Sequence, residues 1–277
     1  MTDVLVVVGV GGMGEAIARR LGAGKRVVLA DFAAPALERV AAGLRGDGFD
    51  VVPHRVDVSS AESVAELAQV AAGLGPVRQI AHTAGLSPVQ APVEAILRVD
   101  LVGVANSLDA FGAVVADGGA GVVIASMAGS MAAGRFPAEM EAALTTTPSD
   151  ALLDLPFLRD GAVTDPGAAY GIAKRANQLR VQSASLVWGA RGARVNSISP
   201  GVISTPMGRQ ELEGESGVMM RQMVQASATR RLGTPHDIAE AAAFLLGGSS
   251  AFVTGTDLLV DGGVVAAMRA GAGTAAV

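Results

Sequence analysis

The chain of 277 residues contains no cysteine, and this absence removes several kinds of chemistry at once. Disulfides, cysteine nucleophiles and thiolate metal sites are excluded. The absence fits a reducing compartment. The apolar opening stretch carries Asp3 and no basic residue, unlike a secretory signal, and no apolar stretch is typical of a membrane span. We therefore expect a cytoplasmic protein without a membrane segment.

Aromatic residues and basic runs are also scarce. Aromatics make up 3% of the residues, whereas half of all residues are apolar and the mean hydropathy is +0.43. The core must therefore consist of alanine, valine, leucine and isoleucine, which suits a sheet covered by helices on both faces. The net charge of −5 and the absence of a basic patch argue against nucleic acid as a partner.

Short β-branched runs alternate with longer amphipathic runs along the chain. We expect strands at 3–8, 26–30, 51–56, 77–82, 121–125, 193–198 and 256–261. Helices are expected at 14–22, 34–46, 60–73, 92–116, 168–189 and 235–247. This alternation predicts a single-domain α/β Rossmann fold over 1–265, with a doubly wound parallel sheet of about seven strands. Residues 266–277 are expected to form a C-terminal tail.

Two segments interrupt this alternation. Residues 131–167 form an insertion with its own helix signals, including Pro137 followed by acidic residues and Thr147 as an N-cap before Pro148. Residues 203–229 are polar and glycine-punctuated but contain four methionines, which suit either a flexible lid over an apolar ligand or ordinary core packing.

The first strand is followed by a glycine-rich turn, VGVGGMG. Gly9, Gly11 and Gly14 match the pattern in which a tight turn brings a pyrophosphate to a helix N-terminus, although an ordinary strand–helix turn gives the same pattern. Asp31 ends the next strand, 22 residues after Gly9. An acid at this distance binds adenosine ribose hydroxyls and repels a 2′-phosphate, so NAD(H) is favoured over NADP(H).

Tyr170 is the only tyrosine, and Lys174 is one of two lysines. Residues four apart share one helix face, so the ammonium of Lys174 can lower the pKa of the Tyr170 phenol and make it an effective base. Ser126 follows a strand, where its hydroxyl can bind a substrate carbonyl oxygen or simply cap a helix. The alternative to a catalytic pair is ordinary packing, with a buried tyrosine beside a surface lysine.

Taken together, these features resemble the short-chain dehydrogenase/reductase family over nearly the whole chain. Further matching stretches are HRVDVS, AHTAGLS, RVNSISPGVISTPM, RLGTPHDIAEAAAFLL and VTGTDLLVDGG. The resemblance implies an enzyme in which Tyr170 is the general acid/base, Ser126 holds the carbonyl and Lys174 binds the nicotinamide ribose. It also implies that the cofactor contacts Gly9, Gly11, Gly12, Met13, Gly14, Asp31, Phe32, Asp57, Val58, Ala84, Gly85, Tyr170, Lys174, Pro200, Gly201, Val202, Ile203 and Thr205.

The chain departs from the family pattern at three points. The glycine loop is one residue shorter than usual. Asp100 stands where the family usually has asparagine, and its charge is expected to oppose Tyr170 ionisation or to pair with Lys174. Ser126 and Tyr170 are 44 positions apart. The long spacing resembles the branch of bacterial 3α-hydroxysteroid dehydrogenase/carbonyl reductases, which implies an apolar or steroid-like alcohol or ketone as substrate.

Other interpretations remain open. The fold could serve a catalytically weak dinucleotide sensor, or a sugar-modifying member of the wider superfamily. No metal site is expected, because His54, His82 and His236 do not cluster with acids at ligand spacing. Trp188 is interpreted as a packing or oligomer contact. The resemblance implies a homodimer or homotetramer built on the helices at 92–116 and 168–189, with the insertion covering part of the second.

Overall fold

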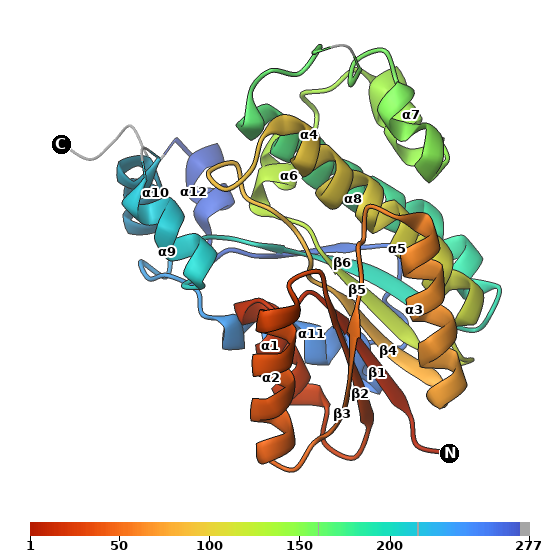
Figure 1. The fold of residues 1–277 in the computed structure, drawn as a ribbon. Coiled ribbons are helices and arrows are strands. Elements are labelled where there is room, and N and C mark those ends of the chain that lie inside the picture. Colours follow the sequence, from red (N-terminus) through yellow and green to blue (C-terminus); the bar gives the residue numbers. More distant parts are fainter. Residues whose placement is uncertain (160, 215, 272–277) are drawn as a thin grey trace.

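A seven-stranded parallel sheet forms the centre of the computed structural model, which describes residues 1–159, 161–214 and 216–271 (Figure 1). The strand order is β3-β2-β1-β4-β5-β6-β7. All seven predicted strands are confirmed: β1 (Val4–Val8), β2 (Arg26–Asp31), β3 (Asp50–Arg55), β4 (Val77–His82), β5 (Ala120–Ile124), β6 (Arg194–Pro200) and β7 (Asp257–Val260). The predicted doubly wound Rossmann fold is therefore correct.

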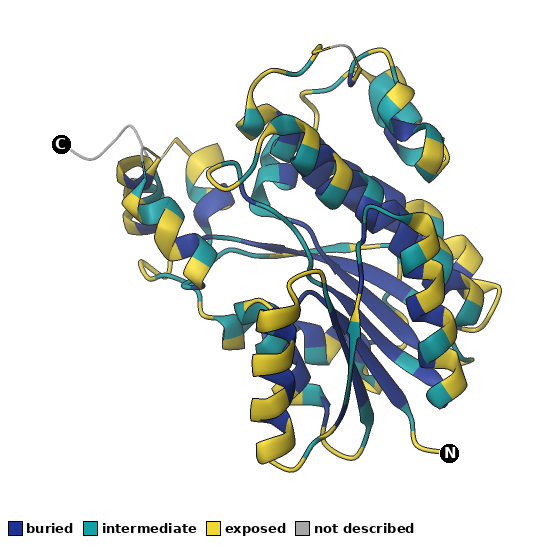
Figure 2. Cartoon of the chain, in the orientation of Figure 1, coloured by how far each residue is buried: buried dark blue, intermediate teal, exposed yellow. Residues whose placement is uncertain are grey.

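Helices cover both faces of this sheet. One face carries α1 (Gly12–Leu21), α2 (Ala34–Gly46) and α11 (Pro235–Leu246), and the other carries α3 (Ala61–Leu74), α5 (Gly103–Val114) and α8 (Pro166–Gly189). In β1, Leu5 and Val7 pack in the first layer, whereas Val4, Val6 and Val8 pack in the second. All five are fully buried, which explains why this strand is a continuous apolar run rather than an alternating one (Figure 2).

The helix predicted at 92–116 is not a uniform α-helix. It begins as α4 (Val93–Ile96), widens into a π-helical segment at Leu97–Val102 and continues as α5. Asp100 lies in the widened segment and is completely buried. Such π segments inside α-helices are frequent at functional sites, and the extra residue changes which side chains face the sheet.

The residues of the insertion form short helices that pack against α8. After α6 (Met127–Ala132) come α7 (Ala138–Thr146) and a 3₁₀ turn at Ser149–Asp154. The Arg180 guanidinium of α8 donates to the carbonyls of Leu144 and Thr147 at the end of α7, at 3.1 and 2.8 Å. Thr147 is the C-cap of α7, and Pro148, rather than the predicted Thr147, is the N-cap of the 3₁₀ turn. The insertion thus lies against α8; homo-oligomerisation stays a prediction.

The remaining elements lie near the carboxyl ends of β6 and β7. They are α9 (Pro206–Glu213), α10 (Gly217–Ala226) and α12 (Val264–Arg269). A 3₁₀ turn at Gly248–Ser250 lies instead near the amino end of β6, where Arg194 donates to the Gly247 carbonyl. The expected tail thus begins inside α12, and its last residues, 272–277, lie outside the described residues. Among the helices that the structure describes, none is long and apolar enough to cross a bilayer.

Trp188 has a packing role at the end of α8. Its indole is 2% exposed, and its N–H donates to the Leu108 carbonyl at 3.1 Å. A β-carbon at Gly121 would lie 2.6 Å from the indole, and one at Gly112 would lie 2.9 Å from it. Both glycines therefore make room for the ring between β5 and α5, as the packing interpretation of Trp188 predicts.

Candidate functional site

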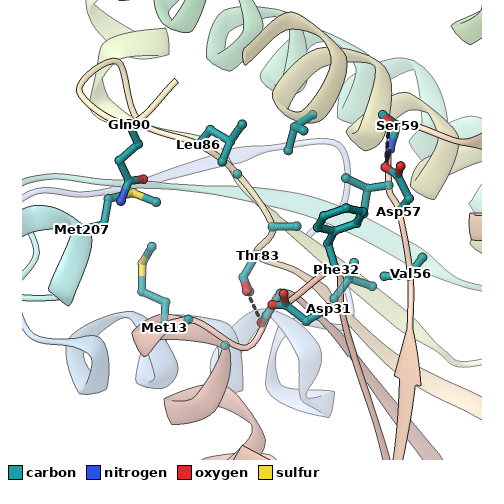
Figure 3. A pocket seen from close by; sticks show the side chains of 18 of the residues that line it. Met13, Asp31, Phe32, Val56, Asp57, Ser59, Thr83, Leu86, Gln90 and Met207 are labelled. Atoms are coloured by element: carbon teal, nitrogen blue, oxygen red, sulfur yellow. Dashed lines mark hydrogen bonds between the residues drawn. The ribbon is translucent and has the colours of Figure 1, made fainter. Parts of the chain in front are cut away.

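A cavity of about 690 Å³ opens at the carboxyl ends of β1, β2, β3 and β4. In an open parallel sheet, ligands bind at this edge, where the direction of strand succession reverses. Asp31, Phe32 and Asp57 stand at one end of the cavity, and Met13, Met207 and Gln90 stand at the other (Figure 3). The cavity is therefore elongated between two chemically different ends.

The glycine loop forms the floor of this cavity. Gly9 has φ +94°, and a β-carbon there would lie 2.5 Å from the Ala84 nitrogen. At Gly14, a β-carbon would collide with the Gly9 carbonyl oxygen, so the start of α1 can pack this closely only with glycine. Gly11 caps α1 in extended conformation, and a β-carbon there would meet nothing within 4 Å. The helix N-terminus is thus open toward the cavity, which fits a pyrophosphate.

Asp31 ties this loop to the second strand. Its Oδ2 accepts from the Val10 N–H at 2.7 Å, and its Oδ1 accepts from the Ala33 N–H at 2.8 Å. The carboxylate also lines the cavity beside Phe32. Asp31 is therefore held in one orientation, with its charge at the end of the cavity where the resemblance places the adenosine ribose.

Arg55 is a neighbour of this carboxylate that the sequence interpretation missed. In the parallel pairing of β2 and β3, Arg55 is the register partner of Asp31. Its guanidinium stacks 4.9 Å from the centroid of the Phe32 ring, and its Nε donates to the Phe32 carbonyl at 3.4 Å. The residues that directly follow Asp31 include no arginine, because this one arrives from the neighbouring strand.

The other predicted cofactor contacts of the first half of the chain also line the cavity. They are Gly12, Met13, Asp57, Val58, Ala84 and Gly85. Asp57 accepts from the Ser59 hydroxyl at 2.6 Å, and the Val58 carbonyl accepts from the Asn106 amide at 3.0 Å. These hydrogen bonds fix the turn after β3 against α5, so the wall of the cavity is preformed.

Residues 200–205 are divided between two places. Thr205 lines the main cavity, and its hydroxyl caps α9 by accepting from the Gly208 N–H at 3.0 Å. Gly201, Val202 and Ile203 instead line a separate cavity of about 210 Å³, and Pro200 ends β6. Contact of Pro200 to Ile203 with a cofactor stays a prediction.

Ser126, Tyr170 and Lys174 converge from two helices. Ser126 caps α6, where its Oγ accepts from the Ala128 N–H at 3.1 Å, and its hydroxyl hydrogen-bonds the Tyr170 phenol. The Lys174 ammonium lies 5.2 Å from the centroid of the Tyr170 ring. Ser126 is therefore both the cap that one interpretation expected and the neighbour of Tyr170 that the other required.

Asp100 forms a buried ion pair with Lys174. The Lys174 Nζ lies 2.9 Å from Asp100 Oδ2 and 3.4 Å from the Ile124 carbonyl oxygen, and Asp100 Oδ1 accepts from the Leu86 N–H at 2.8 Å. Of the two effects expected from Asp100, pairing is therefore present. A β-carbon on Gly85 would lie 3.0 Å from Asp100 Oδ2 and 3.2 Å from Lys174 Nζ, so the loop after β4 passes directly over the pair.

The second effect, opposition to tyrosine ionisation, is present as well. Burial raises the pKa of Tyr170, Lys174 lowers it, and Asp100 raises it again, so the net pKa lies above the ordinary value. Burial opposes the charge of Lys174, but Asp100 and Tyr170 outweigh burial and raise the pKa of Lys174. Burial raises the pKa of Asp100, and Lys174 opposes that rise. Lys174 is therefore a permanent cation divided between two acidic neighbours.

His82 lies behind this pair at the end of β4. Burial, with the charge of Lys174, lowers the pKa of His82 to about 3, so the imidazole is neutral throughout the physiological range. Among the described residues, no group of three histidine, aspartate or glutamate side chains is placed to hold a metal ion.

Gln178 connects the two helices that carry the reacting side chains. This side chain is 2% exposed. Its Nε2 lies 3.1 Å from the Ser130 Oγ of α6, 2.9 Å from the Ser199 Oγ of β6 and 3.1 Å from Asp257 Oδ2 of β7. Its Oε1 accepts from Arg175 at 3.1 Å. One buried amide thus holds α8, α6 and two strands together.

The position of this clamp relates it to the reacting groups. Ser130 stands four residues after Ser126 and Gln178 four residues after Lys174, so each lies one turn along the same helix face. Between them, a β-carbon on Gly129 would lie 2.7 Å from the Lys174 carbonyl oxygen. The clamp therefore ties the helix that Ser126 caps to the helix that carries Tyr170.

A parallel sheet with a glycine loop at its switch point defines the class of Rossmann dinucleotide-binding proteins. Comparison with known families narrows this class. Residues 3–138 match the family model described as short chain dehydrogenase, and residues 144–265 match the one described as enoyl-(acyl carrier protein) reductase. The short-chain dehydrogenase/reductase bsc3 of Alternaria brassicicola is 45% identical over 95% of this chain and 96% of its own. This chain belongs to the short-chain dehydrogenase/reductase family.

More distant relatives agree with this assignment. D-threitol dehydrogenase of Mycolicibacterium smegmatis is 29% identical over 94% of this chain and 91% of its own length. The structure of a short-chain type dehydrogenase/reductase from Mycobacterium ulcerans superposes with a TM-score of 0.75 at 22% identity, covering 96% of this chain and 90% of that one. A single-residue variant of actinorhodin polyketide ketoreductase with NADPH gives 0.74 at 24% identity, covering 95% and 97%. The structural likenesses show the same fold.

Replacement of Asp100 by asparagine removes the charge that raises the pKa of Tyr170. Alcohol oxidation requires the phenolate, so the acid limb of its pH–rate profile is expected to lie at lower pH in Asp100→Asn than in the wild type. Rate profiles of both proteins at saturating cofactor measure this shift. Superimposable profiles would show that Asp100 has no influence on Tyr170.

Replacement of Gln178 by leucine is expected to lower kcat about tenfold, because α6 then shifts relative to α8. Loss of the hydrogen bond from Ser126 also removes a contact that lowers the pKa of Tyr170, so the acid limb should move to higher pH. The matched control is Gln182→Leu, an exposed site on the same helix. Equal kcat values and equal profiles in the two variants would contradict the positioning role.

Proposed function

We propose that this protein is an NAD(H)-dependent oxidoreductase that interconverts a secondary alcohol and a ketone with an apolar body. The observation that carries the proposal is the convergence of Ser126 and Tyr170 beside a buried, positively charged Lys174. These three residues do not themselves line the dinucleotide cavity, but Lys174 lies directly behind Gly85, which does. Membership in an oxidoreductase family that uses nicotinamide dinucleotides supports the proposal. The bound nicotinamide supplies or accepts the hydride.

The protein's own side chains move the proton. In ketone reduction the Tyr170 phenol donates its proton to the carbonyl oxygen, and in alcohol oxidation the phenolate accepts it back. The Ser126 Oγ accepts from the Ala128 N–H, so its hydroxyl hydrogen points to other acceptors: the Tyr170 phenol oxygen here, and the developing oxyanion when substrate is bound. Lys174 stabilises the phenolate, and its distance from the ring is fixed by the ion pair with Asp100.

The preference for NAD(H) follows from the fixed carboxylate of Asp31. A 2′-phosphate on the adenosine ribose would bring two negative charges close to this group, whereas free ribose hydroxyls would donate to it. Arg55 favours NADP(H) instead, because this residue of the neighbouring strand β3 has a guanidinium that can pair with a phosphate. Two backbone hydrogen bonds hold the Asp31 carboxylate in place, whereas the Arg55 side chain is exposed. We therefore expect the charge of Asp31 to decide the cofactor preference.

The apolar substrate follows from what surrounds Tyr170. The Tyr170 ring packs against a buried hydrophobic cluster, and the insertion residues Phe136, Met140, Leu153, Leu155 and Phe157 pack against the same cluster. The segment 203–229 serves as the lid. Its helix α9 places Met207 on the cavity and bonds Gln210 Oε1 to Gln90 Nε2 at 3.0 Å across the opening.

A polyol is the second candidate substrate class. The charge of Glu211, on α9, contributes to raising the pKa of Tyr170, which places a carboxylate near the reacting phenol. A carboxylate in this position would accept hydrogen bonds from neighbouring hydroxyls of a polyol. The relatives named D-threitol dehydrogenase and galactitol 2-dehydrogenase point in the same direction.

The reaction class is tested with purified protein, NADH and a panel of apolar ketones that begins with 3-oxosteroids and ends with ketoses. We expect NADH oxidation with an apolar ketone and a loss of about 10²–10⁴-fold in kcat for Tyr170→Phe, the range typical of a removed general acid. NADH binding by the variant controls for folding. If NADH binds but no carbonyl compound is reduced, the dinucleotide-sensor alternative replaces this proposal.

Cofactor choice is tested at Asp31. Asp31→Asn keeps one acceptor oxygen but removes the charge, so kcat/KM for NADPH relative to NADH is expected to rise about tenfold, a change of about 1.4 kcal/mol. Adding Arg55→Gln to this variant should reverse most of the gain, since the cation next to the ribose is then lost. An unchanged ratio in Asp31→Asn would show that Asp31 does not select the cofactor.

A further inference from the structure

A second hollow of about 490 Å³ lies between α9, α10 and residues 230–232, and we call it the arginine groove. Its lining includes four of the chain's arginines, Arg209, Arg221, Arg230 and Arg231, and among its lining residues only Glu213 is acidic. The whole chain carries a net charge of −5, so this concentration of guanidinium groups is a local exception. The volume lies in the range of small-molecule sites.

Arg230 is in an unfavourable backbone conformation. Its φ is +50°, and it is the only residue other than glycine with positive φ in the part of the chain that the structure describes. Arginine gains nothing from this left-handed conformation, which costs conformational energy and occurs mostly at glycine, asparagine or aspartate. Strained residues of this kind persist where their neighbours hold them, and they cluster at ligand clamps.

The surrounding turn holds Arg230 in this conformation. Its N–H donates to the Ser227 Oγ at 3.2 Å, and the buried Ser227 hydroxyl donates to the Val224 carbonyl at 2.7 Å. The preceding residue, Thr229, donates its N–H to the Gly262 carbonyl at 3.1 Å. The backbone is thus fixed from both sides, while the Arg230 guanidinium has no hydrogen bond or ion pair with any described residue.

The other three arginines are only partly satisfied by the protein. Arg209 and Arg221 each donate to one backbone carbonyl, that of Ser204 at 3.5 Å and that of Leu212 at 2.6 Å. Arg231 forms a two-pronged pair with Asp237, at 2.8 Å on each arm. Among the residues that the structure describes, the four arginines outnumber the carboxylates Glu213 and Asp237, and most guanidinium N–H donors of Arg209, Arg221 and Arg230 have no protein partner.

We propose that the arginine groove binds a phosphate-bearing small molecule, with Arg230, Arg209 and Arg221 as its ligands. Planar guanidinium groups match the oxygens of phosphate in two-pronged pairs, which makes a doubly charged phosphate the best-suited anion. Nucleic acid does not suit this site, since the groove is small and the rest of the chain is acidic.

The groove shares a helix with the dinucleotide cavity. On α9, Met207 lines the cavity, and Gln210 hydrogen-bonds Gln90, which also lines it. Arg209, Leu212 and Glu213 of the same helix line the groove. A ligand that joins α9, α10 and Arg230 would therefore hold α9 over the cavity. The phosphate can belong to a free metabolite or to the distant arm of an extended substrate, and both sources use the same contacts.

The site is tested by calorimetric titration of inorganic pyrophosphate into the full-length protein. NADH is present at saturation so that the glycine loop is filled, and ionic strength is held constant with chloride. We expect saturable binding by the wild type and affinity lowered at least about tenfold in Arg230→Gly and in Arg221→Gln. Arg39→Gln, an exposed arginine on α2, is the matched control and should bind as the wild type does.

Folding is not in question for the central variant, because glycine relieves the strain at position 230 and Arg230→Gly should melt at or above the wild-type temperature. Absence of saturable binding, or equal affinity in wild type, Arg230→Gly and Arg221→Gln, would overturn the proposal. Competition of pyrophosphate with the ketone would identify a substrate arm, and binding without competition would identify a free metabolite. Because binding is measured without turnover, failure here is distinct from failure of the proposed reaction.

Discussion

The buried pair of Lys174 and Asp100 is the interaction on which the reacting site depends. An ammonium and a carboxylate that are both buried are stable only when each satisfies the other, so removing either partner leaves a charge without solvent. The pair joins α8 to the π-helical segment before α5, and the loop at Gly85 closes over it. Tyr170 therefore sits beside a charge whose place is set by the core rather than by the substrate.

Features that depend on neighbouring positions in the sequence could be predicted. The strands followed from β-branched runs, the glycine loop from its spacing, and the meeting of Tyr170 with Lys174 from one helical turn. Arg55 and Gln178 could not be found in this way. Arg55 reaches Asp31 through strand register, and Gln178 reaches partners as many as 79 positions away. Such contacts exist only after the sheet has formed, and no local period encodes them.

The long helix predicted at 92–116 shows a related limit. Its apolar pattern correctly indicates a helix. The segment Leu97–Val102, however, is π-helical, with hydrogen bonds that span one residue more than those of an α-helix, and this changes the direction of the side chains that follow. Asp100 lies inside that turn and is completely buried, and its ion pair with Lys174 joins positions far apart in the sequence. Residues 200–205 are divided by the structure in a way that the motif does not indicate: Thr205 lines the main cavity, whereas Gly201, Val202 and Ile203 line another.

The scarcity of aromatic residues has a consequence for spectroscopy. The only tyrosine and the only tryptophan of the chain both belong to α8, eighteen residues apart, which corresponds to about 27 Å along the helix. Indole emission therefore reports a single place, the docking of the far end of α8 between β5 and α5. Phenolate absorbance, which in most proteins is a sum over many tyrosines, here follows the ionisation of Tyr170 alone.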